Sequence, residues 1–393
     1  MSISPRTAVK KRVEQLNRNV NWKWLKELAD ETVAQAVAIQ QIPAPTFDES
    51  QRAAYVREQF AALGLEQIDT DDVFNVYGLM RGTGSSEKQI MISAHTDTVF
   101  PAESDLTTRQ QGSVIYGPGL GDNSMGVAGM LGLVAALNRE ALRPAADVWF
   151  VATSREEGLG DLGGIRAAYD RLKGQIDHVV NIEGLSFGYI YHAGIAVRRL
   201  RIIAKAEGGH SWLHFGRPSA IHGVIRLGEK ITATQLSNTP RTTYNIGIIK
   251  GGQSINSIAA QAELWLDMRS EEQDALQDLE ARVRGYVDAL TSSELAFDIE
   301  VVGDRPAGAI SVDAPIVHGA MAALAAVGVR GSLERGSTDG NIPLADGCPT
   351  VTVGITRGGN AHRMDEFMET EPVARGLKQL ILLTLALART SLD

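Results

Sequence analysis

The sequence has little cysteine, no excess of basic charge and no apolar run long enough to cross a bilayer. Its single cysteine, Cys348, excludes an intrachain disulfide and any zinc motif built on cysteines. The net charge of −9 is spread along the chain, which argues against nucleic acid and anionic membranes as partners. The N-terminus lacks the apolar core of a signal peptide, and the apolar run at residues 379–388 is shorter than a membrane span. We therefore expect a soluble, reduced, cytoplasmic protein.

Length and composition indicate two globular domains. The 393 residues exceed the size at which a single hydrophobic core usually stops growing. Hydrophobic residues make up 44% and charged residues 22%, which is ordinary for a soluble globular protein. The sequence shows no internal repeat and no low-complexity segment.

Four short apolar runs predict strands that are buried on both faces. Segments with helical spacing lie between several of them, and this alternation is typical of a parallel sheet. We therefore predict an α/β fold, with a mostly parallel sheet and helices on both faces. Further helices are expected within the first 40 residues and at about residues 49–63. The four runs are KQIMISAH (88–95), ADVWFVAT (146–153), DHVVNIEG (177–184) and PTVTVGIT (349–356).

The middle of the chain follows a different pattern. Strands and amphipathic helices occur in the order β-α-β-β-α-β over about residues 191–302, which is the ferredoxin-like arrangement. We expect this segment to be inserted between the two parts of the α/β domain, residues 1–190 and 303–393. An exposed edge of its sheet predicts a homodimer.

Side chains of the kind that bind metal ions stand at or just beyond the carboxyl ends of the four runs. In open α/β sheets, ligands bind in the crevice beyond those strand ends, so these side chains could meet in one place. A further carboxylate precedes a glycine- and alanine-rich helix. The set comprises His95, Asp97, Glu156, Glu157, Glu183 and His362, with Asp122 before the helix.

The spacing of these residues suits a metal-dependent hydrolase. His95 and Asp97 are two residues apart and point to the same side of an extended chain, so one can bind a metal while the other orients it. Of the adjacent Glu156 and Glu157, one can be a ligand and the other a base for a metal-bound water. Asp122 could bridge two metals about 3.5–4 Å apart. Histidines with carboxylates and no thiolates suit zinc, manganese or cobalt.

Six short motifs, taken in order, resemble one metallopeptidase family. This family contains peptidase T, bacterial glutamate carboxypeptidase, acetylornithine deacetylase, succinyl-diaminopimelate desuccinylase and the aminoacylases. The resemblance covers nearly the whole chain from IQQIPAPTFDE onward, and the joint order and spacing of the motifs are specific. The motifs are SAHTDTVFP, GPGLGDNSMG, TSREEGLG, NIEG, GGHSW and AHRMDEFM.

The resemblance implies a zinc-peptidase-like catalytic domain with two divalent metal ions. His95 and Glu183 would hold one ion, Glu157 and His362 the other, and Asp122 would bridge them. The peptide bond between residues 122 and 123 would be cis, as is usual in this family.

The resemblance also assigns catalytic and substrate-binding roles. Asp97 would orient a metal-binding histidine, and Glu156 would be the general base that takes a proton from the metal-bridging water. The inserted segment would be a lid and dimerisation domain, and its His210 would stabilise the oxyanion, often across the dimer interface. Asn256 and Arg269 match positions that hold the substrate carboxylate.

Three residues depart from the family pattern or have no assigned role. Trp212 stands where the family often has a small residue, which puts the shape of the substrate pocket in doubt. Arg155 adds a charge beside the expected base, and Asp339 lies where members of the family vary.

The stretch after the second run also fits a dinucleotide-binding loop. Gly158, Gly160 and Gly163 form a G-x-G-x-x-G pattern between a predicted strand and a predicted helix. Glu183 follows at the distance of a ribose-binding acid. However, two adjacent glutamates oppose a pyrophosphate at that turn, and this alternative leaves the two histidines without a role. A catalytically silent binding protein is disfavoured because the base is intact.

The sequence therefore predicts a hydrolase with two divalent ions, zinc first and manganese or cobalt as alternatives. Its substrate would be a small peptide or N-acyl amino acid with a free carboxylate. The same residues serve aminopeptidases, carboxypeptidases, deacylases and amidohydrolases or deaminases that act on non-peptide C–N bonds. An activity of the last kind is the alternative. We expect a cytoplasmic homodimer with no nucleic-acid or membrane partner.

Overall fold

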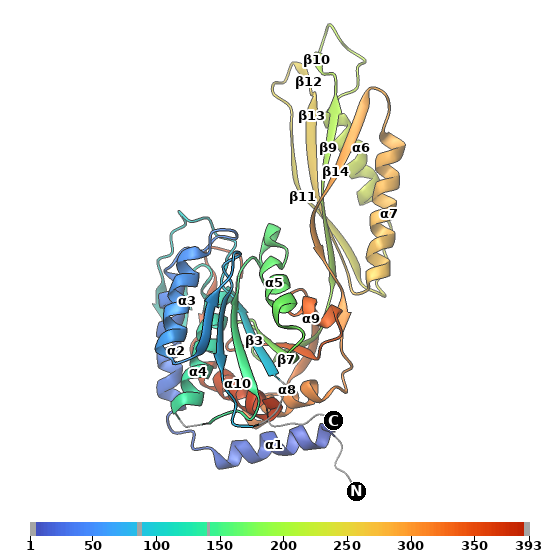
Figure 1. The fold of residues 1–393 in the computed structure, drawn as a ribbon. Helices are drawn as coiled ribbons and strands as arrows, with labels where there is room; N and C mark the ends of the chain where they lie inside the picture. Colours follow the sequence, from blue (N-terminus) through green and yellow to red (C-terminus); the bar gives the residue numbers. More distant parts are fainter. Residues whose placement is uncertain (1–4, 85–88, 140–141, 389–393) are drawn as a thin grey trace. The chain divides into compact units, whose positions relative to one another are not determined.

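The chain divides into two units in the computed structural model, which describes residues 5–84, 89–139 and 142–388 (Figure 1). Unit 1 spans Met1–Gly194 and Gly308–Asp393, and unit 2 spans Ile195–Ala307. The sequence predicts the insertion at about residues 191–302. The observed boundaries lie a few residues later because the strands Tyr189–Gly194 and Gly308–Ala309 both pair within the sheet of unit 1.

Unit 1 is built on a mixed sheet in the order β1-β2-β6-β3-β7-β17-β8-β15, with β16 paired to β8. The four predicted runs form the central strands β6, β3, β7 and β17, which are parallel. The strands at both margins add antiparallel pairs, which the sequence does not predict. Lys88, the first residue of the predicted run 88–95, lies outside the described residues. The strands are β1 (Glu66–Thr70), β2 (Val76–Met80), β3 (Gln89–His95), β6 (Asp147–Thr153), β7 (Ile176–Ile182), β8 (Tyr189–Gly194), β15 (Gly308–Ala309), β16 (Ser332–Gly336) and β17 (Thr350–Val353).

Helices cover both faces of this sheet, as the sequence predicts. Alternate residues of a strand point to opposite faces, so each face has its own core. Ile92 and Phe150 pack with α2, α4, α8 and α10 on one face, and Met91 and Trp149 pack with α5 on the other. Helix α9 contacts α5, and α1 packs on α8 and α10. The helices are α1 (Pro5–Asn19), α2 (Leu25–Gln40), α3 (Ser50–Ala62), α4 (Met125–Arg139), α5 (Gly163–Leu172), α8 (Pro315–Ala326), α9 (Asn341–Ala345) and α10 (Val373–Ala388).

The segment Leu120–Asn138, which includes most of α4, is long and apolar enough to cross a membrane by length and composition. However, 89% of its apolar window is buried inside the protein. Helix α4 contacts β3, β7, α2 and α10, so its place in the core accounts for its composition.

A small second sheet in unit 1 joins distant parts of the chain. Its order is β18-β19-β5-β4, and the pairing of β19 with β5 sets Phe367 opposite Tyr116. This pairing brings the segment after His362 beside the segment before Asp122. The strands are β4 (Arg109–Gln111), β5 (Val114–Tyr116), β18 (Gly358–Gly359) and β19 (Phe367–Glu369).

Unit 2 has the predicted ferredoxin-like topology. Its antiparallel sheet has the order β11-β13-β9-β14, and α6 and α7 pack on β9 and β13. Leu200 and Leu266 belong to the core beneath these helices, and ion pairs such as Arg201–Glu263 join neighbouring strands. The elements are β9 (Ala196–Ala206), β10 (Gly209–His210), α6 (Ala220–Thr232), β11 (Thr242–Gly251), β12 (Ser257–Ile258), β13 (Gln261–Ser270), α7 (Gln273–Leu290) and β14 (Leu295–Arg305).

The variant Gly164→Ala tests how closely α5 packs against the chain that follows β6. A Cβ atom at Gly164 would lie 2.0 Å from the carbonyl oxygen of Ser154, which already accepts the Gly164 N–H at 3.1 Å. Because the backbone must shift, we expect a loss of about 1–3 kcal/mol in the free energy of unfolding. Gly163→Ala is the matched control, since its Cβ would meet the Arg155 side chain at an ordinary 3.5 Å. Equal denaturation midpoints for the two variants would contradict this packing.

Candidate metal centre

The ligand-type side chains meet at the carboxyl ends of the parallel strands. His95 is the last residue of β3, while Glu157 and Glu183 follow β6 and β7. Three sets of three residues each place one ligand atom per residue within 4.8 Å of the others, and one of them, His95 with Glu156 and Glu157, shares a member with each of the other two. The first half-site is His95, Asp122 and Glu183, and the second half-site is Asp122, Glu157 and His362.

Asp122 is shared between the two half-sites. Its Oδ1 lies 3.1 Å from Nε2 of His95, and its Oδ2 lies 3.1 Å from Nε2 of His362. Glu183 Oε2 is 3.6 Å from the His95 Nε2, and Glu157 Oε1 is 2.9 Å from the His362 Nε2. Each half-site thus joins one imidazole nitrogen with two carboxylates, a donor set that suits zinc, manganese or cobalt.

The peptide bond between Asp122 and Asn123 is cis, as the resemblance implies. The Asn123 side chain donates to the carbonyl oxygen of Ile182 at 2.8 Å and accepts the N–H of Gly184 at 2.8 Å. These two bonds fasten the turn that carries Asp122 to the turn that carries Glu183.

Asp97 is a buried carboxylate that contacts both the first histidine and the pair of glutamates. Its Oδ1 lies 3.5 Å from Nδ1 of His95, on the side of the ring away from the half-site. It also accepts the backbone N–H groups of Glu156 and Glu157 at 2.9 and 3.0 Å and the hydroxyl of Thr46 at 2.8 Å. Burial would raise the pKa of Asp97, but His95 and the two N–H groups hold it below its usual value. The backbone carbonyl oxygen of Asp97 lies nearer to the same ring nitrogen, at 3.1 Å, so both its carbonyl and its carboxylate face the Nδ1 side of the imidazole.

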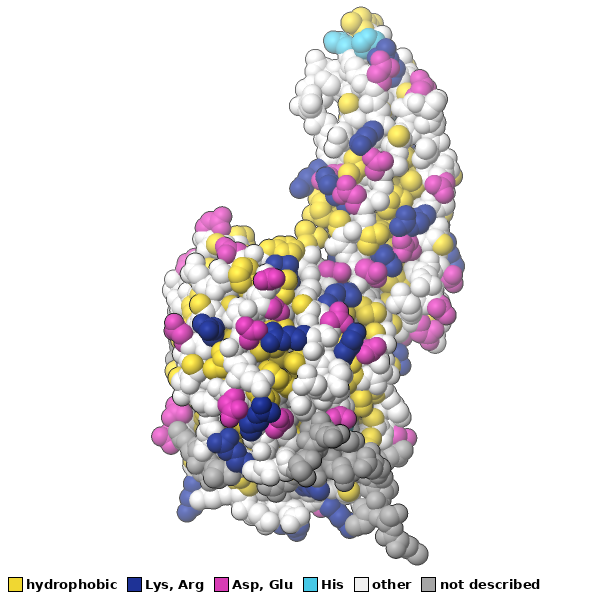
Figure 2. Space-filling view, in the orientation of Figure 1, with side chains coloured by type: hydrophobic (Ala, Val, Ile, Leu, Met, Phe, Trp, Pro, Cys, Tyr) yellow, Lys and Arg dark blue, Asp and Glu magenta, His cyan; other side chains and the backbone are white. Residues whose placement is uncertain are grey.

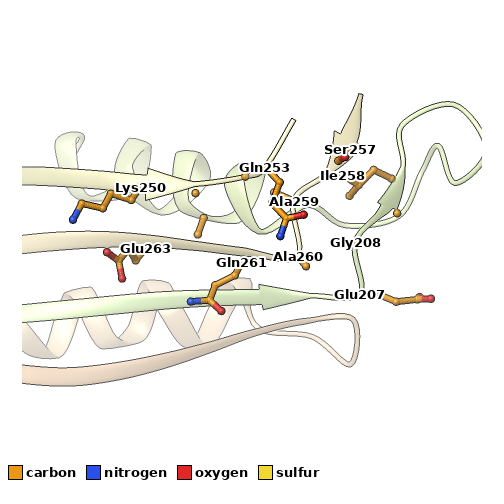
Figure 3. A pocket seen from close by; sticks show the side chains of 14 residues that line it. Glu207, Gly208, Lys250, Gln253, Ser257, Ile258, Ala259, Ala260, Gln261 and Glu263 are labelled. Carbon is orange, nitrogen blue, oxygen red and sulfur yellow. The ribbon is translucent and has the colours of Figure 1, made fainter. Parts of the chain in front are cut away.

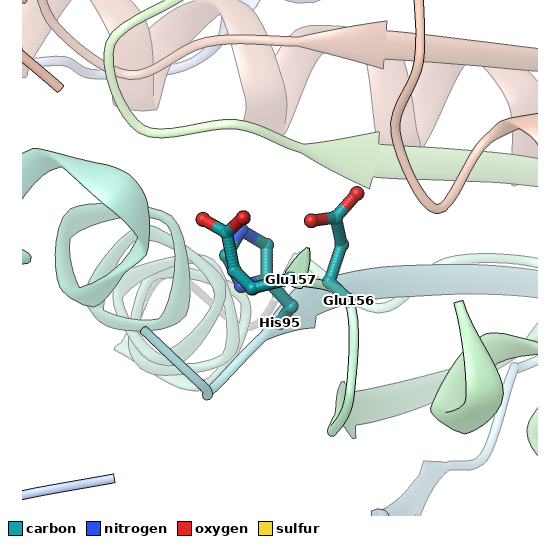
Figure 4. Close-up of side chains that lie close together, drawn as sticks. All are labelled: His95, Glu156 and Glu157. Carbon is teal, nitrogen blue, oxygen red and sulfur yellow. The ribbon is translucent and has the colours of Figure 1, made fainter. Parts of the chain in front are cut away.

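Glu156 and Glu157 both lie within the protein and face the same region. Their exposed fractions are 5% and 6%, and each offers an oxygen within 4.8 Å of a ring nitrogen of His95. Figure 4 shows Glu157 beside the imidazole and Glu156 next to it, with both carboxylates on the same side of the chain. Glu157 belongs to the second half-site, whereas Glu156 belongs to neither.

Without metal ions, protons on His95 and His362 offset the negative charge of the surrounding carboxylates. Burial lowers the pKa of His95, but Glu183, Asp122 and Asp97 raise it more, so it stands well above its usual value. Hydrogen bonds to Asp122 and Glu157 raise the pKa of His362 to about 10. Burial would raise the pKa of Asp122, but the two histidines hold it below its usual value. Metal binding requires unprotonated ligands and would displace these protons.

Arg155, whose role could not be predicted from the sequence, is linked to the buried Glu49. Glu49 is buried, and its Oε1 accepts the backbone N–H groups of Phe47 and Arg155, both at 3.0 Å. Arg155 has a φ of 53°, and its guanidinium carbon lies 5.4 Å from the centre of the Phe47 ring. Glu49 thus holds the backbone of Arg155, which has a left-handed conformation and immediately precedes Glu156. The IPAPTFDE motif contains Glu49, but its partner lies 106 residues away.

Asp339 lies buried near the first half-site. It accepts the hydroxyl of Thr153, which stands opposite His95 in the pairing of β3 with β6. Burial raises the pKa of Asp339 to about 7, although Thr153 and His95 act to lower it. It is not a member of either half-site.

Glu366 is a further buried carboxylate that the sequence analysis does not single out, although it belongs to the AHRMDEFM motif. It contacts the turn that carries Asp122.

The remaining predicted site residues belong to unit 2. His210 is exposed on β10, and its Nδ1 accepts the backbone N–H of Trp212 at 3.2 Å. Trp212, like Phe215, is largely exposed, at 84% and 91%. Figure 2 shows histidine and hydrophobic side chains together at the end of unit 2 that carries β10.

Asn256 and Arg269 do not lie together in unit 2. Asn256 is exposed between β11 and β12, five residues before Gln261, where β13 begins. Arg269 lies near the other end of β13, where it pairs with Asp267 at 3.0 Å. The eight residue-to-residue steps from Gln261 to Arg269 span roughly 27 Å of extended strand. One chain therefore cannot bring both side chains to the same substrate carboxylate.

Unit 2 also contains an open hollow of about 730 Å³ (Figure 3). Gln253 and Ser257 line it on either side of Asn256 in the sequence, and Lys250 and Glu263 give it charge of both signs. All of the residues that line this hollow belong to unit 2.

The turn after β6 does not form a phosphate-binding loop. The N–H of Gly160 donates to the carbonyl oxygen of Glu157, and the N–H of Gly163 donates to that of Arg155. The N–H of Gly164 donates to Ser154. Because these amides are already bonded within the turn, they are not available to a pyrophosphate. The dinucleotide-binding alternative is therefore not favoured.

Comparison with known sequences gives one family and several distant relatives. A model described as peptidase family M20/M25/M40 matches residues 91–386. A succinyl-diaminopimelate desuccinylase of Methylobacterium is 25% identical over 85% of this chain and 90% of its own length. A carboxypeptidase G2 of Pseudomonas is 24% identical over 77% of this chain and 74% of its own length.

Comparison with solved structures gives the same fold. The aminopeptidase PepT of Bacillus cereus superposes with a TM-score of 0.74 at 20% identity, covering 92% of this chain and 99% of that chain. A Bacillus subtilis protein described as a dinuclear metal binding peptidase from the M20 family gives a TM-score of 0.67 at 17% identity, covering 93% and 99%.

The charge of the centre predicts a pH dependence of stability in the chelator-treated protein. The pKa of His362 is raised from 6.5 to about 10, so its protonated form stabilises the folded state below pH 6.5. That contribution is lost as the pH rises through about 10, and His95 acts in the same direction. The thermal midpoint should therefore fall from pH 7 to pH 10, and it should fall less in His362→Gln.

His222→Gln is the control, since this histidine is exposed on α6 in unit 2. Parallel midpoint curves for the wild type and His362→Gln would refute the interaction of His362 with its two carboxylates.

Proposed function

Because this chain belongs to peptidase family M20/M25/M40 and is a metal-dependent amide hydrolase, we propose that its reaction takes place at the two half-sites joined by Asp122. One observation carries this proposal: each oxygen of Asp122 lies 3.1 Å from a different histidine nitrogen. We propose that His95 and Glu183 complete the first ion's ligands and that Glu157 and His362 complete the second's. Zinc is the first candidate, with manganese and cobalt as alternatives.

We propose that Glu156 is the general base. When bound, two divalent ions polarise the substrate carbonyl and lower the pKa of a water in the site. Glu156 stands beside the half-sites without belonging to either, so it can take a proton from the attacking water and return it to the leaving amine. Asp97 holds the His95 ring in place through its Nδ1 side.

We propose that His210 donates a hydrogen bond to the developing oxyanion. Its Nδ1 accepts the Trp212 N–H, so in the neutral ring the proton resides on Nε2. The exposed Nε2–H is then a donor of the kind that stabilises negative charge on a tetrahedral carbon. Trp212 and its apolar neighbours would face the same substrate.

The proposed substrate is a small peptide or N-acyl amino acid with a free carboxylate. Relatives named desuccinylase, deacetylase and carboxypeptidase support N-acyl amino acids as the first compounds to assay. Arg269 and Asn256 are the proposed carboxylate-binding residues. Because they lie at opposite ends of β13, a shared carboxylate needs one of them from a second copy of the chain.

We propose a homodimer formed through the β11 edge of unit 2. The sheet has two edge strands, β11 and β14. Strand β14 carries Asp298 and Glu300, which pair with basic residues of β9, and charged edges resist pairing. Strand β11 exposes two adjacent isoleucines, Ile248 and Ile249, at 43% and 58%, whereas β14 exposes one large hydrophobic residue, Val301, at 45%. Pairing of two β11 strands would cover these isoleucines.

We also propose a cytoplasmic location. The single cysteine, Cys348, is buried on the described chain and is suited to a reducing compartment. A fractionation of the native cells with an antibody against the protein would test this.

The variant Glu156→Ala tests the base. We expect it to retain both metal ions by elemental analysis while hydrolysis of N-acyl amino acids and dipeptides falls about 100- to 10,000-fold. Its matched control is Glu157→Ala, which should lose metal because Glu157 is a ligand in the second half-site. Normal turnover in Glu156→Ala would remove this residue from the reaction.

The variant Ile249→Lys tests the dimer. A charge on the exposed β11 edge should raise the dissociation constant of the dimer at least about tenfold, because it would be buried without a partner. Val301→Lys is the matched control, since Val301 is 45% exposed on the opposite edge. Sedimentation velocity over a concentration series measures both. A monomeric wild type, or equal weakening by the two variants, would exclude this interface.

A further inference from the structure

Glu366 holds the turn that carries Asp122 through a set of backbone hydrogen bonds. Its carboxylate accepts the N–H of Gly119 at 3.1 Å, of Gly121 at 2.7 Å and of Asp122 at 3.0 Å. Its own carbonyl oxygen accepts the N–H of Gly117 at 2.9 Å. The side chain is fully buried, with an exposed fraction of 0%. One residue thus receives four N–H groups from a single short segment.

The position of Glu366 in the chain links two of the three residues of the second half-site, Asp122 and His362. It follows His362 by four residues, and it precedes β19, which pairs with β5 ahead of the Asp122 turn. The His362 side chain is 54% exposed, and the loop that carries it is closed by hydrogen bonds from the N–H of Arg363 to the carbonyl oxygen of Asn360 and from the N–H of Glu366 to that of Arg363. The attachment of Glu366 therefore sets the distance between the His362 loop and the Asp122 turn.

The N–H groups that converge on residue 366 explain why a carboxyl side chain suits this position. Three donors point at one side chain, and the two oxygens of a carboxyl group have lone pairs enough to accept all of them. A glutamine of the same size would turn its NH₂ group toward at least one of these N–H groups. Since the site is closed to water, the displaced N–H would remain unpaired, at a cost of roughly 1–3 kcal/mol.

We propose that Glu366 is a positioning residue for the second half-site, acting through Asp122 and His362 rather than touching metal or substrate. The inference rests on the proposed two-metal function, since it concerns the affinity of the second ion. The first half-site should depend on Glu366 much less. Asn123 ties Asp122 to the Glu183 turn independently, and His95 belongs to β3.

The test compares Glu366→Gln with the wild type and with Glu371→Gln, a matched change at an exposed glutamate on the same segment. Cobalt or zinc is titrated against a competing chelator to give separate affinities for the first and second equivalents. In Glu366→Gln we expect the second equivalent to bind about 10- to 100-fold more weakly, with the first changed less than about threefold. Glu371→Gln should match the wild type.

Amide hydrogen exchange supplies a readout that does not depend on metal. In the metal-free Glu366→Gln protein, the peptide covering residues 117–122 should exchange at least about tenfold faster, while peptides of α10 and β3 stay unchanged. A merely structural loss would speed exchange throughout unit 1. If Glu366→Gln does not fold, Glu366→Asp, which keeps the acceptor oxygens on a shorter side chain, undergoes the same two measurements with the same expected direction.

The outcomes separate this inference from the proposed function. Two equivalents bound to Glu366→Gln with wild-type affinity and unchanged exchange at residues 117–122 would overturn the role of Glu366 alone. A wild type that binds fewer than two equivalents would instead overturn the proposed two-metal function.

Discussion

The mutual repulsion of closely spaced carboxylates governs the architecture of the metal centre. Asp97, Asp122, Glu156, Glu157 and Glu183 lie at the ends of neighbouring elements, where little water reaches them. Like charges so placed favour protonation or separation. The fold counters this with two histidines and with backbone N–H groups aimed at buried acids. Separate polar side chains fasten the ligand-bearing turns to one another: Asp97, Asn123 and Glu366.

The parts of the site that could be predicted from sequence are those that follow from strand ends. The four apolar runs form the parallel centre of the sheet, so His95, Glu157 and Glu183 are brought to one edge by the topology itself. The order of motifs added Asp122 and His362, which stand on loops that no periodicity could place. The β-α-β-β-α-β order of the inserted segment likewise appears as the sheet of unit 2.

The parts that could not be predicted depend on partners remote in sequence. Glu366 bonds to Gly121 across 245 residues, and Glu49 bonds to Arg155 across 106. The sequence around Glu366 or Glu49 does not distinguish either residue from a glutamate exposed to solvent. The antiparallel margins of the main sheet and the small sheet of β18, β19, β5 and β4 rest on strands of two to six residues, too short for a reliable pattern. The observed boundaries of unit 2 lie a few residues after the predicted ones, because the strand Tyr189–Gly194 pairs with strands that follow the insertion in the sequence.

The covalent order of the ligands has a consequence for biosynthesis. All three residues of the first half-site precede residue 184, whereas the second half-site requires His362, which follows Glu183 by 362 − 183 = 179 residues. A nascent chain emerging from the ribosome therefore contains all three residues of the first half-site before the synthesis of unit 2 begins at Ile195. The residues of the second half-site are all present only after His362 has been added. If the two half-sites hold the ions as proposed, the growing polypeptide passes through a stage at which it carries the ligands of one ion only.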